Sequence, residues 1–338
     1  MNPVTPDSAA STAAPLRSFP RWVASLLASS LGKGRLADRV FKLTTLVFAV
    51  AIAGLVVLII VQMARDSMLT FEKFGLSFIW REVWDPVRDE FGALPFIYGT
   101  AVSSIIGLLI AVPVSIGIAV FLVEHAPRVL STPVSFLVQL LAAIPSVVYG
   151  LWGIFVLAPL LRDSVYPRIQ SALGFLPLFQ GNPNGLGLMT AGIILSIMIV
   201  PIVTAVTTDV MRAVPRAQPE ASLALGATKW EATRVVLQNA RSGITGAVIL
   251  GLGRAVGETM AVTMVIGNRP HISASLFDPS FTIASAIANE FTEATTEIYR
   301  HALVELGLIL FIITFVINAL ARLLVWGVTR GQGKVAHA

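Results

Sequence analysis

Cysteine is absent from the 338 residues of the chain, and charged residues are scarce. Without cysteine, a disulfide framework, a thiolate metal site and a cysteine nucleophile are all excluded. Charged residues make up 13% of the chain, against 55% hydrophobic residues. This balance excludes an ordinary water-soluble surface and indicates a protein that crosses a membrane several times.

Motifs for binding nucleotides or metals are also missing. The sequence has no Gly-x-x-x-x-Gly-Lys-Ser/Thr loop, so any ATP hydrolysis must take place on another chain. The histidines fall in expected loops and at the ends of apolar runs, without the spacing of metal ligands: His125, His271, His301 and His337. We therefore expect no metal and no cofactor in this chain, and an intramembrane enzyme is disfavoured.

Long apolar runs dominate what the sequence does contain. A transmembrane helix needs about 20 apolar residues, whereas a β-barrel strand alternates over about ten. The runs here are continuous and long, which predicts an all-α polytopic membrane protein with six transmembrane helices. The expected spans are residues 43–63, 97–123, 134–160, 188–207, 244–267 and 302–326.

Basic residues gather before the first run, between the fourth and fifth runs and after the last one, while acidic residues are frequent after the first run. The net charge of +5 alone would also suit nucleic acid, but this alternation follows the positive-inside rule, so both termini are expected in the cytoplasm. The expected parts are a partly disordered basic tail (1–42), the first transmembrane helix (43–63), an external loop (64–96), a transmembrane core (97–327) with a cytoplasmic loop (208–243), and a C-terminal tail (328–338).

The cytoplasmic loop carries the signals of two short helices. Pro219 suits the start of a helix and Glu220 its first turn, where a carboxylate meets the positive end of the helix dipole. Gly226 provides a stop, and Thr228 with Glu231 has the spacing of a capping box that starts the next helix. The loop is expected to form a rigid docking surface for a partner; the alternative is a solvated surface helix.

The fifth run contains two charges at membrane depth. Arg254 and Glu258 are four residues apart, so they share a helix face and can pair. An isolated charge there costs about 2.5–3.5 kcal/mol or more, and pairing lowers that cost. Arginine also suits phosphate-like anions, because its planar fork donates two parallel hydrogen bonds. A structural ion pair is the alternative, and Gly253-x-x-x-Gly257 predicts close helix packing nearby.

Prolines in the second and third runs predict kinks. Pro113 lies in the second run, and Pro145 in the third is followed by Ser146 and Tyr149. Proline removes a backbone donor and frees a carbonyl, which in a bilayer needs a neighbour or a water-filled path. These residues are therefore candidates for a gate or a helix kink.

Three motifs carry a resemblance to a known family. Glu220-Ala221-Ser222 followed by Gly226 resembles the Glu-Ala-Ala-x-x-x-Gly loop of ABC importer permeases, which couples to the ATPase subunits. Residues 144–150, 251–262 and 302–314 closely resemble motifs of phosphate ABC importer permeases, and residues 151–159 are similar to the PstC branch. The chain departs at Leu237-Gln238, where the family usually has Leu-Pro, so the second helix of the loop is expected to continue further.

The resemblance implies a type I ABC importer permease fold in a bacterial inner membrane. It implies that Arg254 and Glu258 lie in the phosphate path and that ATP and Mg are bound by partner ATPases. The implied partners are a PstA-like permease, a PstB-like ATPase dimer and a PstS-like phosphate-binding protein. The implied coupling residues are Glu220, Ala221, Gly226, Thr228, Trp230 and Glu231.

Two other functions compete with this interpretation. A permease for another oxyanion, such as sulfate or molybdate, would use the same arginine chemistry. A secondary transporter would need its own ion-coupling carboxylates and often an inverted repeat, whereas the chain shows no repeat and one deeply placed acidic residue.

Overall fold

The computed structural model describes residues 21–333, and for residues 21–35, 128 and 324–333 it describes the backbone alone. The outer parts of the two expected tails, residues 1–20 and 334–338, lie outside the described residues. Within the described range there is no β-strand, only isolated bridges at Asp85–Glu90 and Gly267–Ser280. The prediction of an all-α fold is confirmed.

Among the described residues, six helical segments are long and apolar enough to cross a membrane, as predicted. Their ends differ from the expected ones by a few residues in most cases, and by more in the third and fifth. The segments are Leu36–Asp66, Leu94–His125, Ser146–Leu173, Leu188–Arg212, Lys229–Val256 and Glu297–Leu323.

The first span belongs to one uninterrupted helix, α1 (Arg21–Asp66). The helix starts well before the expected first span at residue 43, and it includes residues 21–42 of the segment 1–42 that was predicted to be a partly disordered tail. Residues up to Val61 form a structural unit of their own, and the second unit starts at Gln62.

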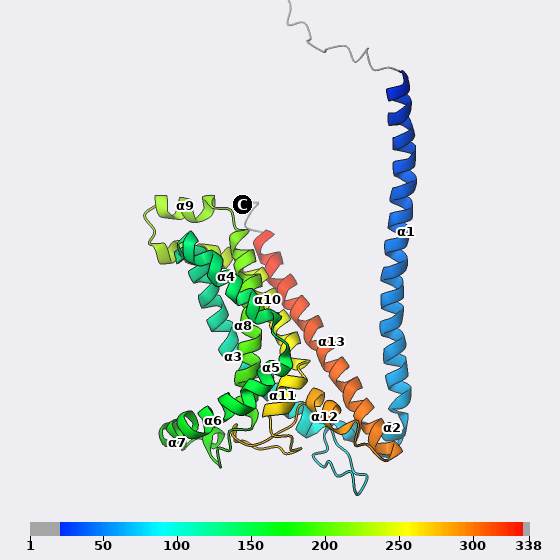
Figure 1. Cartoon of the computed structure of the whole chain (residues 1–338), viewed down its shortest axis with the longest axis vertical. Helices are drawn as coiled ribbons and strands as arrows, with labels where there is room; N and C mark the ends of the chain where they lie inside the picture. The colour runs from blue at the N-terminus through cyan, green and yellow to red at the C-terminus, as the bar shows by residue number, and fades with distance from the viewer. Residues whose placement is uncertain (1–20, 334–338) are drawn as a thin grey trace, which may run out of the picture. The chain divides into compact units, whose positions relative to one another are not determined.

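The second unit contains the other spans and several short helices (Figure 1). Before the third span, its elements are α2 (Met68–Phe74), η1 (Gly75–Ile79), α3 (Leu94–Val120), η2 (Phe121–His125) and α4 (Arg128–Ala143). The third span comprises α5 (Ser146–Trp152), η3 (Gly153–Leu157), α6 (Ala158–Leu160), η4 (Leu161–Val165) and α7 (Tyr166–Leu173). There follow η5 (Pro177–Phe179), α8 (Leu188–Arg212), α9 (Ala217–Ala224), α10 (Lys229–Val256), α11 (Met260–Val265), α12 (Ile283–Glu290) and α13 (Glu297–Gly333).

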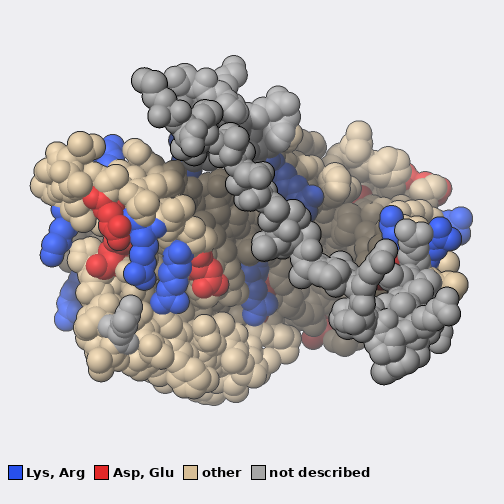
Figure 2. Space-filling model, turned by 90° about the horizontal axis from the view of Figure 1, so that it is seen from above, with Lys and Arg blue, Asp and Glu red and all other residues tan. Residues whose placement is uncertain are grey.

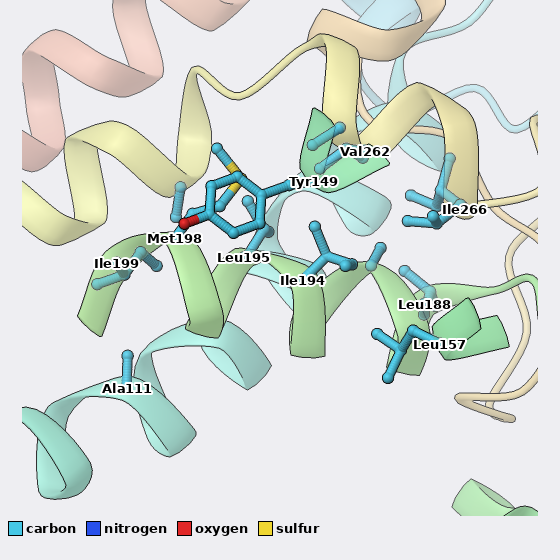
Figure 3. Packing of buried hydrophobic residues seen from close by; sticks show 14 of the residues in the cluster. Ala111, Tyr149, Leu157, Leu188, Ile194, Leu195, Met198, Ile199, Val262 and Ile266 are labelled. Carbon is cyan, nitrogen blue, oxygen red and sulfur yellow. The ribbon is translucent and has the colours of Figure 1, made fainter. Parts of the chain in front are cut away.

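Helix α8 is the centre of this unit and packs against α3 and α10. Most of its residues are buried, the polar side chains of Thr204 and Thr208 included, so it lies among other helices. Figure 3 shows Ile194, Leu195 and Met198 of α8 facing Tyr149 and the residues of α11. Helices α3 and α8 approach closely at Gly192, where an added Cβ would lie 2.4 Å from Cγ2 of Ile106.

The predicted third span, residues 134–160, is wrong in its boundaries. The helix breaks at Ile144, which is extended (φ −67°, ψ 128°) because the ring of Pro145 disfavours the helical conformation before it. Helix α4 is therefore a separate helix, and the spanning segment starts at Ser146. The hydroxyl of Tyr149 donates to the carbonyl oxygen of Leu141 at 2.8 Å, which holds the two sides of the break together.

The fifth span also differs from its prediction, residues 244–267. Helix α10 starts at Lys229 in the loop 208–243 and runs past Leu237-Gln238 without interruption, as the missing proline predicted. It ends at Val256, and a separate helix, α11, follows from Met260. The predicted span thus contains a break between two helices, and Gly257 and Glu258 lie at this break.

Aromatic residues from the loop 64–96 form a packed cluster with α12 and α13. The indole N–H of Trp84 donates to Oε2 of Glu290 at 2.7 Å, and the hydroxyl of Tyr299 donates to the same oxygen at 2.9 Å. The ring of Phe91 stacks on Tyr299 at 5.3 Å between centroids. The loop is therefore an ordered part of the second unit, fixed by a buried carboxyl group.

The stability of this cluster is expected to fall as pH rises. Burial raises the pKa of Glu290 and the charge of Glu293 adds to the shift, while the two hydrogen bonds oppose it. The folded protein thus holds this proton more tightly than the unfolded chain. The protonated side chain of Glu290 therefore stabilises the folded protein fully below the ordinary glutamate pKa of about 4.3, and this stabilisation is lost as pH rises through the raised pKa.

Thermal unfolding of the purified protein in detergent between pH 4 and 8 measures this dependence. Glu290→Gln keeps the shape and an acceptor oxygen but has no proton to lose. The unfolding temperature of this variant is therefore expected to depend less on pH. Glu82→Gln, at an exposed position in the same loop, serves as the control and is expected to leave the pH dependence unchanged. An identical slope in wild type and Glu290→Gln would contradict the assignment.

Candidate functional site

The break between α10 and α11 places a charged side chain beside free backbone groups. The N–H of Gly257 still donates to Gly253 at 3.2 Å, and the chain then turns out of the helix. Oε1 of Glu258 accepts from the N–H of Ala261 at 3.2 Å in the first turn of α11. The carboxylate thus satisfies one of the backbone donors that the break leaves unpaired.

Glu258 also pairs with Arg254, as the spacing predicted. Nη2 of Arg254 lies 2.9 Å from Oε2 of Glu258. The Glu258 side chain is 2% exposed, whereas that of Arg254 is 42% exposed. The buried carboxylate therefore holds one edge of the guanidinium, and the remaining N–H donors of the arginine are available to an anion.

The glycines near this pair differ in what surrounds them. Gly251 packs closely on α8, because an added Cβ would lie 2.8 Å from Cγ2 of Ile199. At Gly253 an added Cβ would meet nothing within 4 Å, and at Gly257 it would meet only the carbonyl of Gly253. Within the described part of the chain, the Gly253-x-x-x-Gly257 pair thus packs against no other helix, so close packing by this pair stays a prediction. The two glycines leave open space beside Arg254.

The predicted kink residues lie at different places. Pro145, Ser146 and Tyr149 are at the start of α5, which packs against α11 so closely that a Cβ on Gly150 would lie 3.1 Å from Cα of Ala261. These residues therefore support the half-helix that follows Glu258. Pro113 lies inside the continuous helix α3.

The loop 208–243 forms the two helices that the sequence predicted. Helix α9 (Ala217–Ala224) has Glu220 in its first turn, although it starts two residues before Pro219. Gly226 has φ +89°, a left-handed conformation that glycine adopts without strain, and it closes the turn between α9 and α10. The loop is thus a compact helix–turn–helix unit.

The capping box at the start of α10 is present in full. The hydroxyl oxygen of Thr228 accepts from the N–H of Glu231 at 3.3 Å, and the N–H of Thr228 donates to Oε2 of Glu231 at 2.7 Å. Two apolar side chains beside this box are uncovered, Leu225 at 91% and Trp230 at 66% exposure. Figure 2, which looks onto the end where α9 lies, shows basic and acidic side chains side by side on this face. Glu220 and Ala221 are exposed there as well.

One helix connects the two predicted sites. From Thr228 at the cap to Arg254, α10 runs without a break, a distance of about 39 Å at 1.5 Å per residue. The exposed turn and the Arg254–Glu258 pair are therefore rigidly linked. The sequence places the two features next to each other, and Gln238 predicted that the second helix of the loop continues further; that this helix and the fifth span are one helix was not predicted.

A family model places these features in a known class of membrane protein. Residues 111–330 match the family described as "Binding-protein-dependent transport system inner membrane component". The match covers more than half of the chain. The chain belongs to this family.

The chain is similar over most of its length to proteins that are named as permeases. A protein of Mesorhizobium japonicum named "Phosphate transport system permease protein PstC" is 50% identical over 85% of this chain and 89% of its own length. A protein of Pasteurella multocida with the same name is 46% identical over 88% of this chain and 94% of its own. A chain from a solved structure of the MetNI methionine ABC transporter aligns at 20% identity with a TM-score of 0.48, over 72% of this chain and 95% of that one.

Proposed function

We propose that the chain is the membrane-spanning permease subunit of an ATP-driven phosphate importer and forms half of the translocation path. The observation that carries this proposal is the Arg254–Glu258 pair, placed at a helix break and joined by α10 to an exposed cytoplasmic turn. The names of the relatives support phosphate as the substrate. The chain is a transport subunit of a bacterial inner membrane with both termini in the cytoplasm, and ATP hydrolysis takes place on a partner.

Arg254 supplies transient recognition of the anion. Its free N–H groups donate to phosphate oxygens, and Glu258 keeps the guanidinium in place. Because the carboxylate is buried and already paired, it offsets the arginine charge without facing the substrate. An anion is then held loosely enough to leave, which transport requires.

The helix–turn–helix unit is the contact for the ATPases. Glu220, Ala221 and Gly226 belong to its first half, and Thr228, Trp230 and Glu231 to its second. When a PstB-like ATPase dimer moves this unit, α10 moves as one body and changes the position of Arg254. A PstA-like permease completes the path, and a PstS-like phosphate-binding protein delivers the anion from outside.

Cells that lack this chain are expected to lose uptake of radiolabelled phosphate at low external concentration and to keep uptake of labelled sulfate. The intact gene restores the phosphate uptake. Loss of sulfate uptake with unchanged phosphate uptake would leave the transporter class intact and contradict the substrate. Retention of both would contradict the proposed function.

A further inference from the structure

A polar seam runs between α4 and α8, away from the Arg254–Glu258 pair in the sequence. Each helix carries a polar side chain at every fourth position, which places the three side chains of that helix on one face. The seam residues are Ser131, Ser135 and Gln139 on α4, and Thr204, Thr208 and Arg212 on α8.

These two stripes face each other. Nη2 of Arg212 donates to the hydroxyl oxygen of Ser131 at 3.3 Å, which fixes the register at the cytoplasmic end. The other four seam residues, together with Arg212 and Asp209, line one crevice of about 40 Å³. Since Ser131 pairs with the last of the three α8 residues, the two helices run in opposite directions along the seam.

Several hydroxyl groups in the crevice lack a partner. Oγ1 of Thr204, Oγ1 of Thr208 and Oγ of Ser135 are buried and have no hydrogen-bond partner within the described part of the chain. The two threonine residues are only 1% and 3% exposed. A hydroxyl in a helix can bond to the carbonyl four residues earlier, and leaving it unpaired is costly. Three such groups turned to one crevice indicate a polar ligand.

The lining of the crevice suits an oxyanion that carries a proton. Arg212 and the hydroxyls are donors, and the carboxylate of Asp209 is an acceptor. At roughly 10–15 Å³ for each water, the crevice has room for about three to four water-sized groups, and a tetrahedral oxyanion has four oxygens. It adjoins a larger cavity of about 620 Å³ that shares Arg212 and extends to Arg216 and Glu220 at α9.

We propose that this crevice is a second binding site, for a phosphate group that carries a proton. Arg212, Ser135 and Thr208 donate hydrogen bonds to its oxygens, and the carboxylate of Asp209 accepts a hydrogen bond from its P–OH group. Fully ionised sulfate has no proton to donate and is rejected by Asp209. The bound anion bridges α4 and α8 beside the helix–turn–helix unit. The site stands independently of the proposed import function, because free phosphate and a phosphomonoester headgroup share this chemistry.

Direct binding of inorganic phosphate tests the site. The full-length chain, assembled with its partner subunits but without the binding protein or ATP, is placed in phosphatidylcholine nanodiscs. Binding of radiolabelled phosphate is measured in an Arg254→Gln background, so that the first site does not contribute. Thr208→Val and Arg212→Gln are expected to weaken binding at least tenfold. Thr207→Val is the matched control, because Thr207 is equally buried, also unpaired and outside the crevice.

Two further experiments test whether the site prefers phosphate over sulfate and whether it binds free phosphate or a lipid headgroup. Asp209→Asn is expected to let sulfate compete with phosphate, and an unchanged preference would overturn the role of Asp209. Phosphatidic acid in the nanodiscs carries the same protonated group; competition by it assigns the site to a lipid, and lack of competition assigns it to free phosphate. Binding that is insensitive to Thr208→Val and Arg212→Gln, or equally weakened by Thr207→Val, would overturn the site.

Discussion

Replacement of Arg254 by Gln is expected to abolish phosphate uptake while the subunits still assemble. The guanidinium donates to Glu258 through one edge and has its remaining donors exposed. Charge-assisted hydrogen bonds contribute about 1.5–3 kcal/mol each, so loss of two such bonds lowers uptake at low phosphate at least about a hundredfold. Uptake of radiolabelled phosphate and co-purification of the partner subunits are the two measurements. Normal uptake would remove the arginine from the mechanism.

A double variant separates this role from a structural ion pair. Arg254→Gln alone leaves the buried Glu258 without its partner, which is destabilising in its own right. Arg254→Gln combined with Glu258→Gln removes both charges and is expected to restore thermal stability without restoring uptake. Recovery of uptake in the double variant would show that the pair only holds the helices together. Arg254→Lys keeps the charge but lacks the planar fork, so partial uptake is expected.

Replacement of Gly99 by Ala is expected to destabilise the second unit by about 3 kcal/mol, the upper end of the usual cost of overpacking. An added Cβ would lie 2.0 Å from the carbonyl oxygen of Phe281 and 2.8 Å from Oγ of Ser280. The clash is with backbone that is itself anchored, since the N–H of Ser280 donates to Ile266 at 3.0 Å. Relief therefore requires α3 to move away from the segment before α12.

Thermal unfolding of the purified protein measures this effect, with the yield of folded protein as a second readout. Gly117→Ala is the matched control, because it lies in the same helix and an added Cβ there meets nothing within 4 Å. The control is expected to unfold at the wild-type temperature or slightly above, since alanine is the better helix former. Equal unfolding temperatures for the two variants would contradict the close packing at Gly99.

Features that depend on local sequence were predictable. Apolar runs of sufficient length gave the six spans, because the bilayer sets a minimum length. The capping box at Thr228 and Glu231 and the left-handed turn at Gly226 follow from side chains a few residues apart. The pairing of Arg254 with Glu258 follows from helical spacing in the same way.

Features that depend on distant contacts were not predictable. Trp84 and Glu290 are 206 residues apart, and no local pattern indicates that they share a hydrogen bond. The break at Gly257 lies within an apolar run, where hydropathy gives the same signal for a straight and for a broken helix, whereas the break at Ile144 follows from the neighbouring Pro145 and agrees with the predicted kink. Gly253 and Gly257 have a spacing that permits close packing, but spacing alone does not show which helix packs there.

The continuity of α10 also bears on how such permeases diverge. Arg254 and the Thr228 cap lie on one helix but about seven turns apart, and they share no contact. If the proposed function holds, a substitution near Arg254 alters which anion is recognised without changing the proposed contact with the ATPase. We accordingly expect that transferring residues 251–262 between permeases for different anions changes the anion selectivity and leaves the contact with the ATPase unchanged.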